Sequence, residues 1–132
     1  MHGKLSESDI HQLRTALGQR EQRLRYLVQL ARQASPSAAL RSADNEVFGC
    51  EARVWLKAVW LADKLQLACD SESRTVLGLL QLLSSALQGA SRDQVRQFDL
   101  EAYFHALGLA DLITSSRRNG LRHVVQAIQA SA

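Results

Sequence analysis

The fold is decided by the stretch between residues 52 and 68, which reads ARVWLKAVWLADKLQLA. Apolar residues alternate with their neighbours as far as Leu61, and this period of two is typical of a β-strand with one buried face. Ala62-Asp63-Lys64 then predicts a tight turn, after which the alternation resumes. The pattern therefore predicts a β-hairpin over about residues 51–68.

Apolar residues at helical spacing predict helices on both sides of this hairpin. Ser6 is the expected N-cap of the first helix, the second spans about residues 20–34, and residues 38–46 are expected to form a loop. Further helices are expected after Asp70-Ser71-Glu72, after Ser91, near Leu100 to Leu107, and after Thr114-Ser115-Ser116.

The helix expected after Asp70-Ser71-Glu72, with Ser71 as its N-cap and Gly89 just past its end, is apolar around most of its circumference. Such a helix is buried. We therefore predict an α+β fold, in which a small antiparallel sheet packs against several helices, within a single domain of residues 1–132.

The bulk composition is that of an ordinary globular protein, with 132 residues, 46% of them hydrophobic, and a net charge of +3. Basic residues are scattered from Lys4 to Arg122 among acidic ones, whereas nucleic-acid binders usually gather them on one face. No apolar run approaches the ~20 residues of a membrane span, and residues 1–7 lack the apolar stretch of a signal peptide. We expect a cytoplasmic protein that binds neither nucleic acid nor membrane.

The chain has two cysteines, Cys50 and Cys69, and four dispersed histidines, so no metal site is expected. In the predicted hairpin Cys69 lies nearly opposite Leu56, about six residues from Cys50, or ~20 Å at the rise of a strand. A disulfide needs Cα atoms within ~7 Å, so we predict two free thiols.

Cys50 follows Gly49 at the point where a loop is expected to become a strand. Composition alone favours a buried, inert thiol, because free cysteines are often buried. A functional thiol would instead need to be reachable and able to ionise. Gly49 would leave room for the backbone of a partner to approach the sulfur.

Three blocks of sequence resemble the SufE family, especially its CsdE branch. The first block runs from Gly49 to Leu56 and is preceded by Asn45, the second runs from Cys69 to Leu80, and the third runs from Ser115 to Leu121. They read GCEARVWL, CDSESRTVLGLL and SSRRNGL, and they occur in the order of the family and at nearly its spacing.

The resemblance implies a sulfur acceptor and activator that has no cofactor of its own and is not an enzyme. Its partner would be a cysteine desulfurase that carries pyridoxal phosphate. Cys50 would take sulfur from the desulfurase persulfide and pass it to a cluster scaffold of iron–sulfur assembly or to another acceptor. Candidates for the loop or the partner interface are Asn45, Gly49, Glu51, Arg53, Asp70 and Arg117.

Two cations are candidates for lowering the pKa of Cys50: Arg53 in the same segment, and Arg117 if the last helix approaches. A transferable sulfur must be protected from reductants. We therefore expect Cys50 to be largely sheltered in the free protein, in a loop that moves on docking.

The chain also departs from the family pattern. Residues 20–24 read REQRL where the family usually has Trp-x-x-Lys-Tyr, and Cys69 stands where the family has glycine. Two other hypotheses therefore stay open. One is a regulatory module that binds the desulfurase without taking sulfur, and the other is a redox sensor that uses Cys50 and Cys69.

Overall fold

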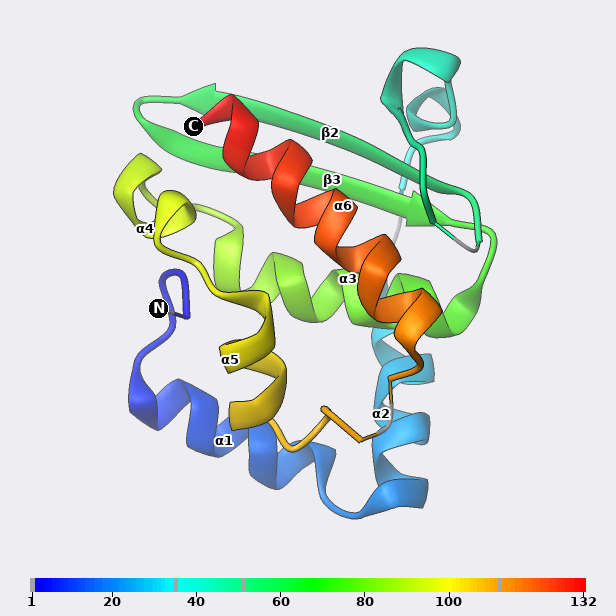
Figure 1. The fold of residues 1–132 in the computed structure, drawn as a ribbon, viewed down its shortest axis with the longest axis vertical. Helices are drawn as coiled ribbons and strands as arrows, with labels where there is room; N and C mark the ends of the chain where they lie inside the picture. Colours follow the sequence, from blue (N-terminus) through cyan, green and yellow to red (C-terminus); the bar gives the residue numbers. More distant parts are fainter. Residues whose placement is uncertain (1, 35, 51, 112) are drawn as a thin grey trace.

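The structure, a computed structural model, describes residues 2–34, 36–50, 52–111 and 113–132 (Figure 1). The helices in this part of the chain are α1 (Glu7–Leu17), α2 (Arg20–Gln33), α3 (Arg74–Leu87), α4 (Arg92–Arg96), α5 (Leu100–Ala106) and α6 (Ser115–Ser131). The strands are β1 (Glu46–Val47), β2 (Val54–Leu61) and β3 (Lys64–Ser71), which form one antiparallel sheet in the order β1-β2-β3. The predicted α+β class is confirmed.

The hairpin of β2 and β3 turns at Ala62 and Asp63, within the predicted turn Ala62-Asp63-Lys64, and Lys64 already belongs to β3. Both residues have positive φ, 51° and 60°, the geometry of a two-residue type I′ turn whose twist suits the flanking strands. Leu56 pairs with Cys69, which is the predicted register. The strands begin and end about three residues later than expected from the alternation alone.

The predicted start of the central helix is wrong. Asp70 and Ser71 complete β3, where they pair with Trp55 and Val54, and α3 begins only after Ser73. The Ser73 hydroxyl accepts a hydrogen bond from the amide of Val76 and is therefore the true N-cap. Strand pairing with two buried residues of β2 outweighs the local helix-start signal of a Ser and an acid.

The segment predicted as a loop, residues 38–46, is more ordered than expected. It contains two short 3₁₀ turns, η1 (Ala38–Leu40) and η2 (Ala43–Asn45), and it leads into β1. Glu46 and Val47 pair with Trp55 and Val54, so β1 covers one end of the exposed edge of β2. Two residues of strand are too few to leave a periodic pattern in the sequence.

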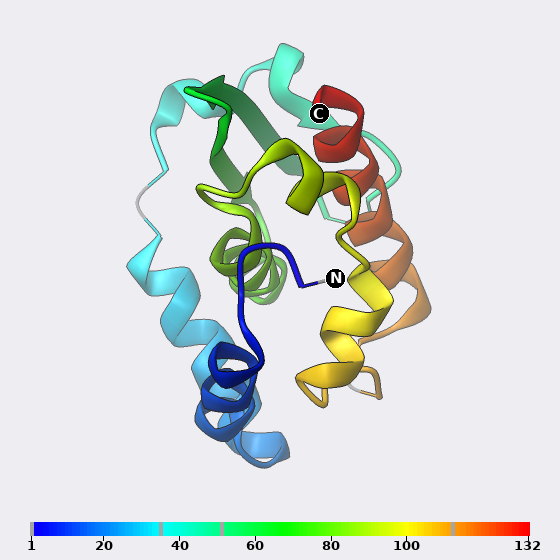
Figure 2. The ribbon, with the colours of Figure 1, turned by 90° about the vertical axis from the view of Figure 1, so that its left-hand side faces the viewer.

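The helices cover one face of the sheet. Helix α3 packs on β3, and α6 packs on β1 and β2. Figure 2 shows α3 between α2 on one side and α6 on the other. Helix α3 is the buried centre of the molecule, as predicted, with Leu80, Leu82 and Leu83 completely buried. None of the helices that the structure describes is long and apolar enough to span a membrane.

Candidate functional site

Cys50 lies in the loop that joins β1 to β2. Val47 and Val54 pair across the two strands, so residues 48–53 form the connection between them. Glu51, one of the predicted interface residues, lies outside the described residues. The two paired strands fix both ends of this loop, and helix α6 lies against its middle.

The Cys50 side chain points at helix α6. Its Sγ donates a hydrogen bond to the backbone carbonyl oxygen of Gly120 at 3.4 Å. A Cβ at position 120 would lie only 3.2 Å from the Cys50 Cα and 3.5 Å from its Sγ. The loop and the helix therefore pack closely at Gly120, where a side chain would crowd the Cα of Cys50.

Mostly apolar side chains surround the thiol. They come from the loop, β2, α3 and α6: Ala52, Val54, Val76, Arg117, Leu121 and Val124. The cavity beside them has a volume of about 10 Å³, roughly the room that one water molecule requires. The sulfur is thus half-buried beside a space of about one atom.

Gly49 determines how the loop reverses before Cys50. Its φ is +93°, a backbone conformation that residues with a side chain rarely adopt. The imidazole of His123, on α6, fills the space that a Cβ would occupy, because two of its ring atoms would lie 2.8 Å from that Cβ. Glycine is therefore needed at position 49 both for the φ angle and for the contact with His123.

Burial raises the pKa of the Cys50 thiol above its usual value. This direction is opposite to the hypothesis that Arg53 or Arg117 lowers the pKa. The Arg53 guanidinium is engaged elsewhere, since it donates to both carboxylate oxygens of Glu46, at 2.9 and 3.3 Å. In the structure of the free protein, the site therefore favours the protonated thiol over the nucleophilic thiolate.

Arg117 lies in the first turn of α6 and lines the cavity beside Cys50. Its backbone amide is capped by the hydroxyl of Thr114, at 3.3 Å. The last helix therefore does approach the cysteine loop, which was the condition for Arg117 to lie near Cys50. A role for Arg117 in partner binding stays a prediction.

Asp70 belongs to a polar cluster on the other face of the sheet. Its buried carboxylate accepts a hydrogen bond from Arg41 Nε at 2.7 Å and another from the amide of Ser71 at 2.8 Å. The guanidinium carbons of Arg41 and Arg53 lie 4.7 and 4.8 Å from the ring centroid of Trp55. This Trp55 cluster, made of Arg41, Arg53, Trp55, Asp70 and Glu46, joins η1 to all three strands at the base of the cysteine loop.

Asn45 lies just before β1 and does not reach into the cavity that Cys50 lines. Its side-chain amide donates to the carbonyl of Leu40 at 3.1 Å and so ties η2 to η1. The side chain shapes the segment that enters the cysteine loop.

Cys69 has a different environment from Cys50, and both thiols are free. Cys69 lies on the inner face of β3, where burial raises its pKa to about 12. A thiol with that pKa is almost entirely protonated near neutral pH and is a poor nucleophile.

Sequence reasoning missed three residues of this arrangement: Gly120, His123 and Arg41. Gly120 did leave a signal, because a glycine inside a helix costs stability and often marks a close approach of another segment. His123 and Arg41 left none, since their partners, Gly49 and Asp70, are far from them in the sequence.

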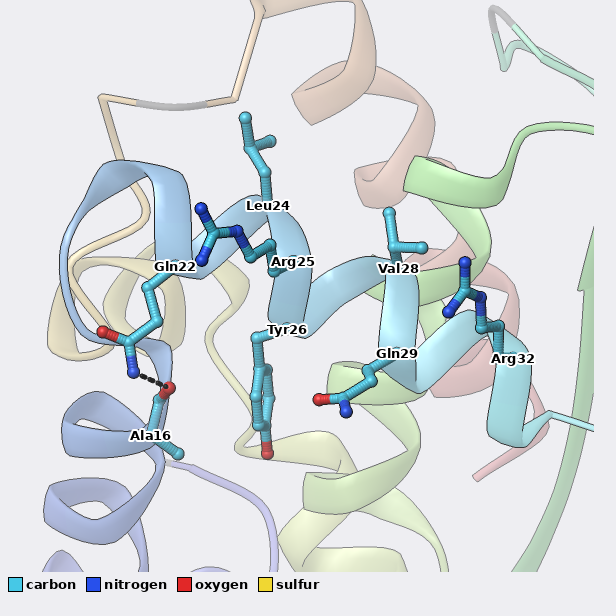
Figure 3. A pocket seen from close by; sticks show the side chains of 8 residues that line it. All are labelled: Ala16, Gln22, Leu24, Arg25, Tyr26, Val28, Gln29 and Arg32. Atoms are coloured by element: carbon cyan, nitrogen blue, oxygen red, sulfur yellow. Dashed lines mark hydrogen bonds between the residues drawn. The ribbon is translucent and has the colours of Figure 1, made fainter.

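A larger groove lies along α2, away from the cysteines, with a volume of about 610 Å³. Figure 3 shows its lining, in which Gln22 bonds the carbonyl of Ala16 and Leu24 extends outward. Arg23, in the stretch that departs from the family pattern, donates to the carbonyls of Gly18 and Gly108 and so links two loops. No cysteine is among the residues that line this groove.

Comparison with known proteins points to one family. The model of the SufE family, described as Fe-S metabolism associated domain, matches residues 8–132. The chain is 36% identical to the sulfur acceptor protein CsdE of Escherichia coli over 118 residues, which cover 87% of this chain and 80% of that protein. It is 31% identical to an uncharacterized SufE-like protein of Haemophilus influenzae over 96 residues, which cover 67% of this chain and 76% of that protein.

A solved structure shares the fold. The solution structure of a hypothetical protein from Thermus thermophilus superposes with a TM-score of 0.76 and covers 94% of this chain and 90% of that one. The sequence identity is 21%, so the likeness concerns the fold.

Proposed function

The chain belongs to the SufE family, and from this premise we propose that it accepts sulfur at Cys50 from a cysteine desulfurase and activates that enzyme. The observation that carries the proposal is the placement of Cys50. Its thiol lies in a loop whose two ends are fixed by strand pairing and whose middle rests against α6 through Gly120. The name of the Escherichia coli relative, a sulfur acceptor protein, supports the same role.

The proposed transfer is an exchange between sulfur atoms. The Cys50 thiolate attacks the terminal sulfur of a persulfide on the desulfurase, a new S–S bond forms at Cys50, and the donor cysteine leaves as a thiolate. The proton of the Cys50 thiol goes to a base or to water, and no external oxidant or reductant is needed. The product is a persulfide on Cys50.

Burial supports a carrier role for this thiol. A half-buried sulfur is less accessible to small molecules than an exposed one, which would protect a sulfur carried on Cys50 between transfers. The cavity beside Sγ is apolar and has room for about one atom, so an added sulfur would lie against Val76 and Leu121. Attack on the partner then requires the loop to leave α6, because Sγ points at the Gly120 carbonyl.

In this proposal the chain carries no cofactor, and the pyridoxal phosphate belongs to the desulfurase. The sulfur passes from Cys50 to a cluster scaffold of iron–sulfur assembly or to another acceptor. A reducing cytoplasm suits the chemistry, because it keeps Cys50 free between transfers.

A desulfurase assay with cysteine as substrate and alanine as the measured product tests the proposal. We expect the wild-type chain to stimulate alanine release and Cys50→Ser to lose the stimulation, while the matched Cys69→Ser keeps it. Full stimulation by Cys50→Ser would contradict the carrier role and favour the regulatory module. A disulfide between Cys50 and Cys69 after peroxide treatment would favour the redox sensor.

A further inference from the structure

Phe48 is the most exposed large hydrophobic side chain among the described residues, at 76%. It begins the loop that carries Cys50, two residues before the thiol. A single exposed apolar residue on a surface needs no explanation by itself. The position of Phe48 beside the one half-buried thiol makes it different from Leu61 and Leu24, which are exposed on the sheet hairpin and on α2.

The backbone between Phe48 and Cys50 directs the two side chains differently. Gly49 reverses the chain with its φ of +93° and rests against the ring of His123. Cys50 then turns toward α6, where it meets Gly120, whereas Phe48 stays in solvent. The loop thus holds its thiol inward and its aromatic ring outward.

Any protein that delivers sulfur to Cys50 must also meet Phe48. The Cα atoms of the two residues are at most about 7.6 Å apart, because each trans peptide spans 3.80 Å. A standard interface covers about 800 Å² on each partner, a disc of roughly 16 Å radius. A disc of that size centred near the reacting sulfur includes Phe48.

We propose that Phe48 is the docking anchor of this chain, and that its ring enters an apolar recess beside the persulfide-bearing cysteine of the desulfurase. The proposal deepens the proposed function and rests on it. Aromatic side chains dominate the energetics of many interfaces, and one that is already exposed contributes nearly its whole apolar surface on docking.

The test measures sulfur loading of Cys50 at increasing concentrations of purified cysteine desulfurase from the same organism, with cysteine in excess. We expect Phe48→Ala to raise the half-saturating desulfurase concentration by roughly 10- to 100-fold, the size of an interface hot spot, and Phe48→Leu to fall between Ala and wild type. At saturation, the loaded fraction should approach that of wild type.

The matched control is Leu61→Ala. Leu61 is 60% exposed but lies at the far end of β2, about 23 Å along the strand from Val54. It should therefore lie outside the interface and leave the half-saturating concentration unchanged. Both variants should unfold at the temperature of the wild type, because neither side chain packs in the core.

If Phe48→Ala and wild type had the same half-saturating desulfurase concentration, Phe48 would not be the docking anchor, and the proposed function would be unaffected. An equal loss in Leu61→Ala would also overturn it, because the effect would not be local. A wild-type chain that takes no sulfur on Cys50 would overturn both proposals. A wild-type dimer that Phe48→Ala converts to a monomer would assign the ring to self-association instead.

Discussion

The Sγ of Cys50 lies 3.4 Å from the backbone carbonyl oxygen of Gly120, which joins the cysteine loop to the first half of α6. A Cβ at position 120 would crowd this contact, since it would lie 3.2 Å from the Cα of Cys50 and 3.4 and 3.5 Å from its Cβ and Sγ. The thiol therefore packs against α6 when the loop is closed. The quality of this packing should control how often the loop opens.

Gly120→Ala should make Cys50 more reactive. The added methyl group overpacks the contact and should cost the closed loop about 1 kcal/mol, which corresponds to roughly a fivefold gain in the open population. The measurement is the rate of Cys50 alkylation by iodoacetamide. The matched control, Gln126→Ala on an exposed turn of the same helix, should react like wild type. Equal rates in all three proteins would contradict the account of the contact.

The pH dependence of alkylation should report the raised pKa of Cys50. Burial disfavours the thiolate, so the rate should reach half of its maximum at a pH above that of a free cysteine, about 8.5. A short peptide of residues 45–55 is the control, because it has the same neighbours in sequence but no helix α6. A midpoint in the folded protein below that of the peptide would revive the hypothesis that Arg53 or Arg117 activates the thiol.

Asp70→Asn should destabilise the fold. The Asp70 side chain is only 7% exposed and pairs with Arg41 Nε at 2.7 Å, so the substitution leaves the arginine without its carboxylate. We expect a loss of about 1–3 kcal/mol in the free energy of unfolding, measured with urea. Asp63→Asn is the control, because the Asp63 side chain is 90% exposed and 3.6 Å from Arg92, and it should change the value by less than about 0.5 kcal/mol. Equal effects of the two substitutions would show that the Trp55 cluster does not stabilise the sheet.

Cys69 should make the protein less stable at alkaline pH. Its pKa is about 12 in the folded protein and about 8.5 in an unfolded chain, so the folded state holds this proton more tightly. The free energy of unfolding therefore falls as the pH rises above 8.5. Between pH 8 and 9.5, wild type should lose about 1 kcal/mol more than Cys69→Ala. Parallel pH profiles of the two proteins would mean that the Cys69 thiol is not buried in solution.

The strand hairpin could be predicted from the sequence because the period of two is a local signal. The alternation predicts a turn within Ala62-Asp63-Lys64 and Cys69 nearly opposite Leu56, and the structure has the turn at Ala62-Asp63 and pairs Leu56 with Cys69. The start of α3 could not be predicted from the sequence. Asp70 and Ser71 carry a helix-start signal, but their pairing with β2 overrides it. The strand β1 was missed for a related reason, since its two residues form a strand only through their pairing with β2.

Only part of the candidate site could likewise be predicted from the sequence. Cys50 and Gly49 could be singled out because they are adjacent in a recognisable block of sequence. The residues that bury the thiol and set its pKa could not be predicted, because they come from α6 and α3, more than twenty residues away in the chain. Arg53 and Arg117 were the candidates for lowering the pKa of Cys50, whereas burial raises it, in a site lined by Leu121, Val124 and Val76.

The central claim, that Cys50 accepts sulfur, is tested most directly by the intact mass of the chain after incubation with cysteine desulfurase and cysteine. We expect the mass to increase by one sulfur atom, the increase to map to the peptide that contains Cys50, and a reductant to remove it. The increase should be absent from Cys50→Ser and retained in Cys69→Ser. An unchanged mass, or a sulfur that maps to Cys69, would contradict the account.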